Sequence, residues 1–228
     1  MKHLNKILGI IALTALIGFS MTACDPGGGG GGGGALGDTL TLSGQTYDIV
    51  YGDNGVDFTE YTGNAIVSSG YRDVNGYWEP LYASGVVNNG QLSFSIGEPD
   101  ELIPVSDMLP AGATASDVTA KGISLQLTTG GGSYLVRMNE TMSLSGGSVA
   151  YTKDSVMYMY VDKNVIGSSE TITESAGGMT ITRNAYNVSL QEGWNQIYVR
   201  TVNDYSAMTV TITVSTSQPS NLKWVFED

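Results

Sequence analysis

Residues 206–216 read SAMTVTITVST, in which apolar side chains and threonines take alternate positions along the centre of the stretch. Successive side chains of a β-strand point to opposite faces of a sheet, so this alternation predicts a strand with one buried and one exposed face. Pro219 ends the strand. Leu222, Trp224 and Phe226 then alternate in the same way, and we expect a last strand that packs on the core.

Two other stretches indicate how such strands are arranged. Asn89-Gly90 lies between two alternating stretches, and these residue types tolerate the positive φ of a tight hairpin turn. Residues 156–161 (VMYMYV) are apolar on both faces. We therefore expect an antiparallel hairpin around Asn89-Gly90, and a strand at 156–161 in the middle of a sheet whose two sides are covered.

Alternating stretches recur through residues 39–228 and are separated by Gly, Asn, Asp and Ser. They predict an all-β domain, an antiparallel sandwich or barrel of about 11–14 short strands with little helix. The proline-containing residues 98–121 break the rhythm, and helical turns are expected there at 100–109 and 116–118. One domain is the preferred interpretation, and two packed β units with a seam at 98–121 are the alternative.

The first 23 residues have the features of a secretory signal peptide. Lys2 and Lys6 precede an apolar run at residues 7–19, and small residues lead into Cys24. The run is too short to be interpreted as a membrane-spanning helix.

Thr22, Ala23 and Cys24, placed after such a run, resemble the lipobox of bacterial lipoproteins. The resemblance implies that the chain is cut before Cys24 and that this residue carries a diacylglycerol and further acyl chains, such as palmitate, as its membrane anchor. Residues 24–38, with glycine at every position from 27 to 34, are then a flexible tether. A plain secretory signal followed by an unmodified cysteine is the alternative.

Three stretches resemble β-rich lipoproteins of spirochaetes and similar bacteria. They are the Cys-Asp-Pro-polyglycine start at residues 24–34, VDKNVIG at residues 161–167 and LQEGWNQIY at residues 190–198. The resemblance implies an anchored envelope protein with a β fold, and it implies no catalytic residue. Inner or outer membrane, and periplasmic or surface exposure, stay open.

The chain is acidic, with 10 Lys and Arg against 22 Asp and Glu, so its net charge is −12. Residues 1–23 contain two lysines and no acid, so without them 8 bases face 22 acids and the net charge becomes −14. This balance argues against a nucleic acid partner and against electrostatic attachment to anionic lipid.

The only histidine, His3, lies in the signal segment, and the only cysteine is Cys24. The β domain therefore has no residues for disulfides, for Cys/His zinc sites or for Ser-His-Asp and Cys-His nucleophilic catalysis. An enzyme would have to use carboxylates, lysine, tyrosine or an oxygen-bound metal, and we expect a non-enzymatic protein without a cofactor.

Two groups of residues are candidates for ligand binding. Tyr71, Tyr77, Trp78 and Tyr82 cluster around one loop, and exposed aromatic rings are a common way for β domains to bind sugars or apolar ligands. Ordinary packing and strand-edge positions are the favoured alternative for these four residues.

Asp53, Asn54, Asp57 and Glu60 place oxygen ligands of the kind that calcium prefers in one loop. The spacing departs from the EF-hand pattern, so a solvated turn is the favoured interpretation and a calcium site the alternative.

A hydrolase would need two facing carboxylates about 5–9.5 Å apart. The candidates for such a pair are Glu98, Asp100, Glu101, Glu170 and Glu174. The stretch from Ser220 to Lys223 matches the Ser-x-x-Lys of penicillin-recognising enzymes in letters only, because the accompanying motifs are missing.

These observations predict a lipid-anchored cell-envelope protein that binds a ligand or has a structural role. The lipid bilayer is its expected partner through the acyl chains of Cys24, together with a glycan, a small molecule or another envelope protein. A carboxylate-dependent secreted hydrolase and a surface adhesin are the alternatives.

Overall fold

The computed structural model describes residues 36–52, 55–73, 75–109, 113–145, 148–215 and 218–227. Strands form nearly all of the regular structure in these ranges, so the predicted all-β class is confirmed. The signal segment, Cys24 and the polyglycine run lie outside the described residues.

The strands of the first half are β1 (Leu40–Gly52), β2 (Gly55–Glu60), β3 (Ala65–Arg72), β4 (Trp78–Asn88), β5 (Gln91–Ile96), β6 (Ile103–Pro104), β7 (Thr114–Ala115) and β8 (Lys121–Thr129). Those of the second half are β9 (Tyr134–Ser145), β10 (Ser148–Val161), β11 (Val165–Ser169), β12 (Ile172–Ala176), β13 (Met179–Arg183), β14 (Tyr186–Leu190), β15 (Gly193–Asp204), β16 (Thr209–Ser215) and β17 (Lys223–Glu227). The described part thus has 17 strands, more than the 11–14 expected, and two of them are only two residues long.

One helical turn, α2 (Val105–Met108), lies within the expected range of 100–109. Residues 116–118 are not helical, which corrects that expectation. The Asp117 carboxylate instead accepts a hydrogen bond from the backbone N–H of Thr119 at 2.8 Å and closes a turn. No helix in the described ranges has the length and apolarity needed to cross a membrane.

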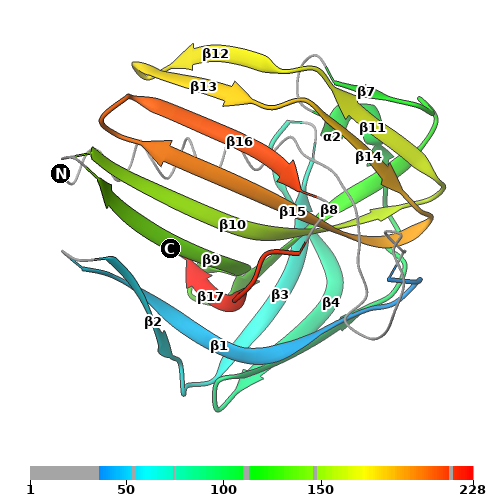
Figure 1. The fold of residues 1–228 in the computed structure, drawn as a ribbon. Helices are drawn as coiled ribbons and strands as arrows, with labels where there is room; N and C mark the ends of the chain where they lie inside the picture. The colour runs from blue at the N-terminus through cyan, green and yellow to red at the C-terminus, as the bar shows by residue number, and fades with distance from the viewer. Residues whose placement is uncertain are drawn as a thin grey trace.

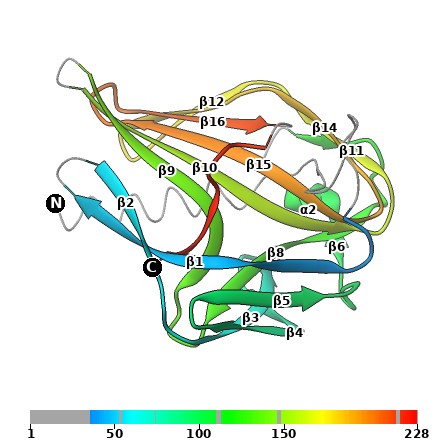
Figure 2. The ribbon, with the colours of Figure 1, turned by 60° about the horizontal axis from the view of Figure 1, so that its bottom comes forward.

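Fourteen strands form one large sheet in the order β12-β13-β16-β15-β10-β9-β17-β1-β5-β4-β3-β8-β6, with β2 beside β1. Because β8 also pairs with β9 and β10, the strands from β9 through β17, β1, β5, β4 and β3 to β8 close into a ring. A second sheet has the order β14-β11-β7. Figures 1 and 2 show the resulting layers, with β10 and β15 between the β1-β5-β4-β3 side and the β11-β14 side.

Most pairs are antiparallel, as expected, but two are parallel. β17 runs parallel to β1, and β13 runs parallel to β16. The large sheet is therefore mixed, and the expected antiparallel pairing holds for the other described strand pairs. Alternation along a strand identifies its buried face and carries no information about the direction of its neighbour.

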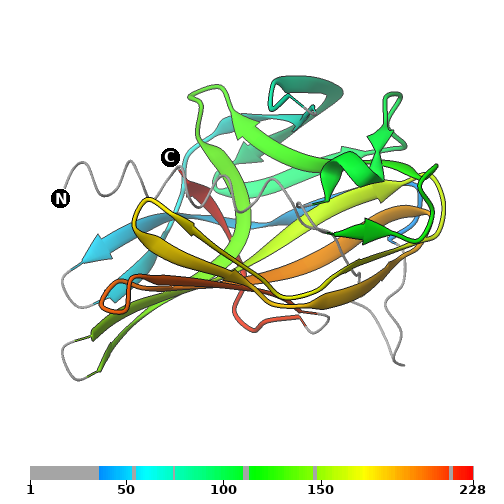
Figure 3. The ribbon, with the colours of Figure 1, turned by 90° about the horizontal axis from the view of Figure 1, so that it is seen from above.

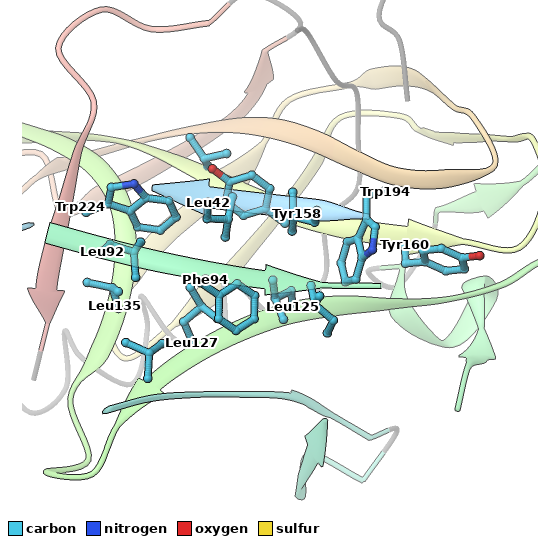
Figure 4. Close-up of a cluster of buried hydrophobic side chains, with 14 of the residues drawn as sticks. Leu42, Leu92, Phe94, Leu125, Leu127, Leu135, Tyr158, Tyr160, Trp194 and Trp224 are labelled. Atoms are coloured by element: carbon cyan, nitrogen blue, oxygen red, sulfur yellow. The ribbon is translucent and has the colours of Figure 1, made fainter. Parts of the chain in front are cut away.

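The large sheet separates two hydrophobic cores. The ring core lies inside the closed ring and includes Trp194, Trp224 and Tyr158 (Figure 4). The outer core lies between the other face of β10, β15, β16 and β13 and the cover made by β11, β14 and α2. Burial of such side chains contributes roughly 1.5–3 kcal/mol each.

β10 confirms the prediction for residues 156–161, because all six side chains are buried. Val156, Tyr158 and Tyr160 belong to the ring core. Their neighbours Met157, Met159 and Val161 belong to the outer core. A strand that faces two cores needs apolar side chains at every position.

Residues 98–121 connect the two cores. β6 pairs with β8 in the large sheet, and β7 pairs with β11 in the small sheet. Ile103 packs against both cores.

The paired part of the chain begins before residue 39. The backbone N–H of Leu36 donates to the Trp194 carbonyl at 2.6 Å, and the backbone N–H of Trp194 donates to the Gly37 carbonyl at 3.0 Å.

Candidate functional site

The structure separates the four aromatic residues that the sequence placed together. Tyr71 points into the ring core and is buried. Burial and, secondarily, the nearby Glu101 carboxylate raise the pKa of its hydroxyl. Tyr71 is therefore a core residue, which matches the packing alternative.

Trp78 and Tyr77 also have structural explanations. Trp78 is half-buried, and a Cβ built at Gly70 would lie only 2.3 Å from its Cζ2, so its indole packs directly on that backbone. Tyr77 is exposed on the turn before β4, where its backbone N–H donates to the Asp73 carboxylate at 2.7 Å. These two residues and Tyr71 do not form a common binding surface.

Tyr82 differs from the other three, because 98% of its surface is exposed. It lies in β4 among outward-facing residues that alternate with the ones packed on the ring core. The register between β3 and β4 is irregular there, since Ser68 pairs with Ser84 but Ser69 pairs with Leu81. Tyr82 thus lies in a β-bulge, a feature that redirects side chains and is common beside functional sites.

Ser69 holds this bulge from inside the sheet. Its hydroxyl is buried and donates to the Ala83 carbonyl at 2.7 Å, with a longer contact to the Leu81 carbonyl at 3.5 Å. The hydroxyl satisfies backbone acceptors that the interrupted ladder leaves without their usual donors. The hydrogen bonds of Ser69 to the backbone on either side of Tyr82 therefore hold this side chain in its outward position.

An apolar pair lies on the same outward side of β3 and β4. Ile66 and Val86 are directly opposite each other in the register, and they are 68% and 50% exposed. They border a shallow hollow of about 360 Å³ that opens to solvent. The hollow is lined by Asn64, Ala65, Ile66, Val86, Val87 and Asn88.

We call Tyr82, together with these six lining residues, the Tyr82 face. Sequence reasoning missed Ile66 and Val86 as site residues. Their positions in the sequence could have identified them, because they alternate with the core residues Val67 and Val87 and therefore point outward.

The predicted hairpin turn fixes one end of the hollow. Asn89 and Gly90 have φ of 47° and 77°, which confirms the tight turn between β4 and β5. The N–H of Asn89 donates to the Asn64 side-chain oxygen at 2.8 Å. A Cβ on Gly90 would lie 1.9 Å from the Tyr61 carbonyl oxygen, so only glycine permits this close approach.

The lining of the hollow carries no charged side chain, although the chain as a whole is strongly acidic. Its floor is aliphatic, and its polar groups are the amides of Asn64 and Asn88. Such a surface can pack against an apolar group or the C–H face of a sugar while the amides form hydrogen bonds. It has no group suited to acid–base or nucleophilic catalysis.

Replacement of Ser69 by alanine should weaken the bulge. The Ala83 carbonyl would lose its buried donor, and we expect the free energy of unfolding to fall by about 1–3 kcal/mol. Urea denaturation measures this loss. Ser68→Ala, at the exposed neighbouring position, is the matched control, and equal effects of the two substitutions would contradict the assigned role of Ser69.

The proposed calcium ligands are only partly described. Asp53 and Asn54 lie outside the described residues. Asp57 and Glu60 are exposed on β2, three positions apart, so their side chains point to opposite faces of that strand. In the ranges that the structure describes, no group of three or more His, Cys, Asp or Glu side chains is placed to hold a metal ion.

The acids considered for hydrolysis lie in two separate regions. Glu98 and Glu101 lie beside tyrosines of the ring core, and burial together with Glu98 raises the pKa of Tyr160 to about 12. Asp100 is exposed in the same segment. The other two candidates are on the β11-β12 side, where Glu174 forms an ion pair with Arg183 at 2.6 Å and Glu170 is exposed.

The Ser-x-x-Lys stretch has a packing role at its lysine. Lys223 begins β17, and its ammonium lies 4.7 Å from the ring centroids of both Tyr47 and Phe58. This arrangement is a cation–π contact between strands, which is worth about 0.5–1 kcal/mol at an exposed site. Ser220 lies in the preceding turn.

Comparisons of this chain with protein-family models, with curated proteins and with solved structures find no match.

Proposed function

We propose that the chain is a membrane-anchored, non-enzymatic binding module of a cell envelope and that the Tyr82 face contacts its ligand. The observation that carries this proposal is the 98% exposure of Tyr82 on a bulge that a buried serine holds in place. A large aromatic side chain gains little for the fold when its ring is in water. We therefore infer that Tyr82 acts through contact with another molecule.

The anchoring part of the proposal rests on the sequence. Residues 1–23 have the order of charged, apolar and small residues typical of a signal peptide, and Cys24 follows a lipobox-like motif. Acyl chains on Cys24 would insert into the bilayer, and the polyglycine run would give the β domain freedom to reach its ligand. Either membrane of a two-membrane envelope suits this arrangement.

The Tyr82 face favours an uncharged ligand. A charged group that entered the hollow would lose hydration without meeting an opposite charge among the six lining residues. A neutral saccharide unit, or an apolar group of another envelope component, fits the combination of aliphatic floor, amide groups and exposed aromatic ring.

Substitution of Tyr82 by alanine should remove binding without lowering stability. The side chain is almost fully exposed, so we expect the free energy of unfolding to change by less than about 0.5 kcal/mol. The measurement is a thermal-shift screen of the full-length chain in mild detergent against neutral saccharides, peptidoglycan fragments and lipids. A ligand at 100 times its Kd adds about 2.7 kcal/mol to the folded state, and Tyr82→Ala should abolish that shift.

Two further variants define the face. Ile66→Thr combined with Val86→Thr keeps β-branched side chains and removes apolar surface from the hollow, so it should also abolish the shift. Tyr77→Ala removes a second exposed tyrosine outside the hollow and should leave the shift intact. A ligand that shifts all four proteins equally, or one that is hydrolysed, would refute the proposal.

A further inference from the structure

A group of ionisable side chains lies away from the Tyr82 face, on strands β1, β9, β10 and β17. Glu140 of β9 is directly opposite Lys153 of β10 in the register. Lys153 forms an ion pair with Glu227 of β17. The hydroxyl of Tyr51, from β1, donates to Glu140 Oε2 at 3.3 Å.

Glu140 and Lys153 are neighbours across a ladder, but the Lys153–Glu227 and Tyr51–Glu140 contacts join residues that are not paired in the sheet. β9 lies between β10 and β17, and the register places Glu227 opposite Tyr134, six residues away from Glu140 on the same strand. Lys153 can reach Glu227 over β9 only because the sheet is strongly curved there, as the course of β9 in Figures 2 and 3 shows. The side chains therefore connect β10 with β17, and β1 with β9, across a strongly curved part of the sheet.

A short pairing of strands closes this curved part of the sheet. β17 closes the ring by pairing with β1 over three residue pairs, and this pairing is parallel. Parallel pairs are slightly less stable per residue than antiparallel pairs. The last β1–β17 pair is at Asp48, and Tyr51 lies three residues beyond it. The hydrogen bond from Tyr51 to Glu140 therefore joins the end of β1 to β9 independently of β17.

The charges in this group do not balance. Glu140 is only 9% exposed, and the Lys153 side chain is 13% exposed, so both are largely removed from water. Two carboxylates, those of Glu140 and Glu227, face one ammonium. When both carboxylates are ionised, the single ammonium therefore cannot neutralise both negative charges.

We propose that Glu140, Lys153, Glu227 and Tyr51 form a proton-controlled clasp, which is tight when Glu140 is protonated and weakened when Glu140 is ionised. Protonation removes a charge that burial keeps away from water, and this gain outweighs the lost attraction to Lys153 and the weaker hydrogen bond from Tyr51. A clasp of this kind makes the closure of the ring at β17 dependent on pH.

The surroundings of Glu140 support the direction of this effect. Burial raises the pKa of Glu140, Lys153 lowers it, Glu227 raises it and the hydrogen bond from Tyr51 lowers it, with a net rise above the ordinary value of 4.5. Tyr205, in the turn that follows β15, has its own pKa raised to about 12 by burial and, in smaller part, by Tyr151 of β10 and by Glu140. β2 and β8 also pack against β9; the acids of β2 are exposed, and β8 contains no acid.

The direction in which stability changes with pH follows from the linkage between proton binding and folding. A carboxyl group whose pKa is higher in the folded chain than in the unfolded chain binds its proton more tightly when folded. Stability should therefore rise as the pH falls from neutral through the raised pKa of Glu140, and the gain should be complete near the ordinary value of 4.5. Opening at β17 should accordingly be easier at neutral and alkaline pH.

Hydrogen exchange of the full-length chain between pH 5 and pH 8 tests the clasp. Protection factors, corrected for intrinsic exchange, should be higher at pH 5 for the amides of β17 and of its partners in β1 and β9. The expected change is about tenfold for each unit by which the pKa of Glu140 is raised. Glu140→Gln imitates the protonated form, so it should have high protection at both pH values.

Glu174→Gln is the matched control, because it removes an exposed acid from an ion pair with Arg183 at the far edge of the sheet. It should keep the pH dependence of the unmodified chain at β17. The same pH dependence in Glu140→Gln would overturn the clasp, and so would an equal change in β12 and β13. An NMR titration that places the Glu140 carboxyl at or below 4.5 would overturn it independently of any variant.

Discussion

A chain that lacks residues 221–228 is expected to yield no soluble, folded protein. Those residues contain β17, which lies between β9 and β1 and completes the ring. Within β17, Trp224 stacks on Tyr158 with ring centroids 6.1 Å apart and donates from Nε1 to the Ser43 carbonyl at 3.1 Å. Val225 is fully buried.

The deletion would expose the ring core and leave two strand edges without partners, a combination that promotes aggregation. Solubility, circular dichroism and the melting temperature measure the outcome. A chain shortened only by Asp228 retains β17 and is the control. An unchanged melting temperature after the eight-residue deletion would show that β17 is not part of the core.

Replacement of Trp194 by alanine is the single substitution with the largest expected effect. The side chain is fully buried, packs edge-to-face on Tyr160 at 5.5 Å and donates from Nε1 to the Gly97 carbonyl at 3.0 Å. Its backbone also pairs with Gly37 at the start of the described chain. We expect a loss of about 3–5 kcal/mol, a large part of the total stability of a typical domain.

Urea denaturation of the full-length chain measures that loss. Trp78→Ala is the control, because it removes the same side chain from a half-buried position against the backbone of Gly70. We expect the control to lose clearly less stability than Trp194→Ala. Equal losses would mean that the buried contacts of Trp194, which lies beside Tyr160 in Figure 4, do not have the expected weight in the ring core.

Local features of the fold could be predicted from the sequence, because they depend on neighbouring residues. Residues 156–161 were expected to be covered on both sides, and the turn at Asn89-Gly90 was expected to be tight. Closure of the ring could not be predicted. It brings Tyr47 beside Val225 across most of the chain, and alternation within one strand does not say which strand lies next to it.

The candidate site shows the same division. Tyr82 was among the predicted residues, but Tyr71 was grouped with it although Tyr71 points into the ring core. Tyr71 of β3 and Tyr82 of β4 face opposite sides of the sheet, and no residue type marks the irregular register at Tyr82. Pairing between strands also decides that Glu140 meets Lys153, so that group could not be predicted either.

The central claim is that the Tyr82 face contacts another molecule. Site-specific photo-cross-linking tests it most directly, with an aromatic photoreactive residue, which keeps a ring at position 82, in the full-length chain in intact cells. Position 118, where Val118 is 76% exposed on a turn outside the face, is the control. We predict a discrete adduct at position 82 that disappears when Ile66 and Val86 are both replaced by threonine, and no such adduct at position 118. Adducts that are identical at both positions, or no adduct at position 82, would contradict the account.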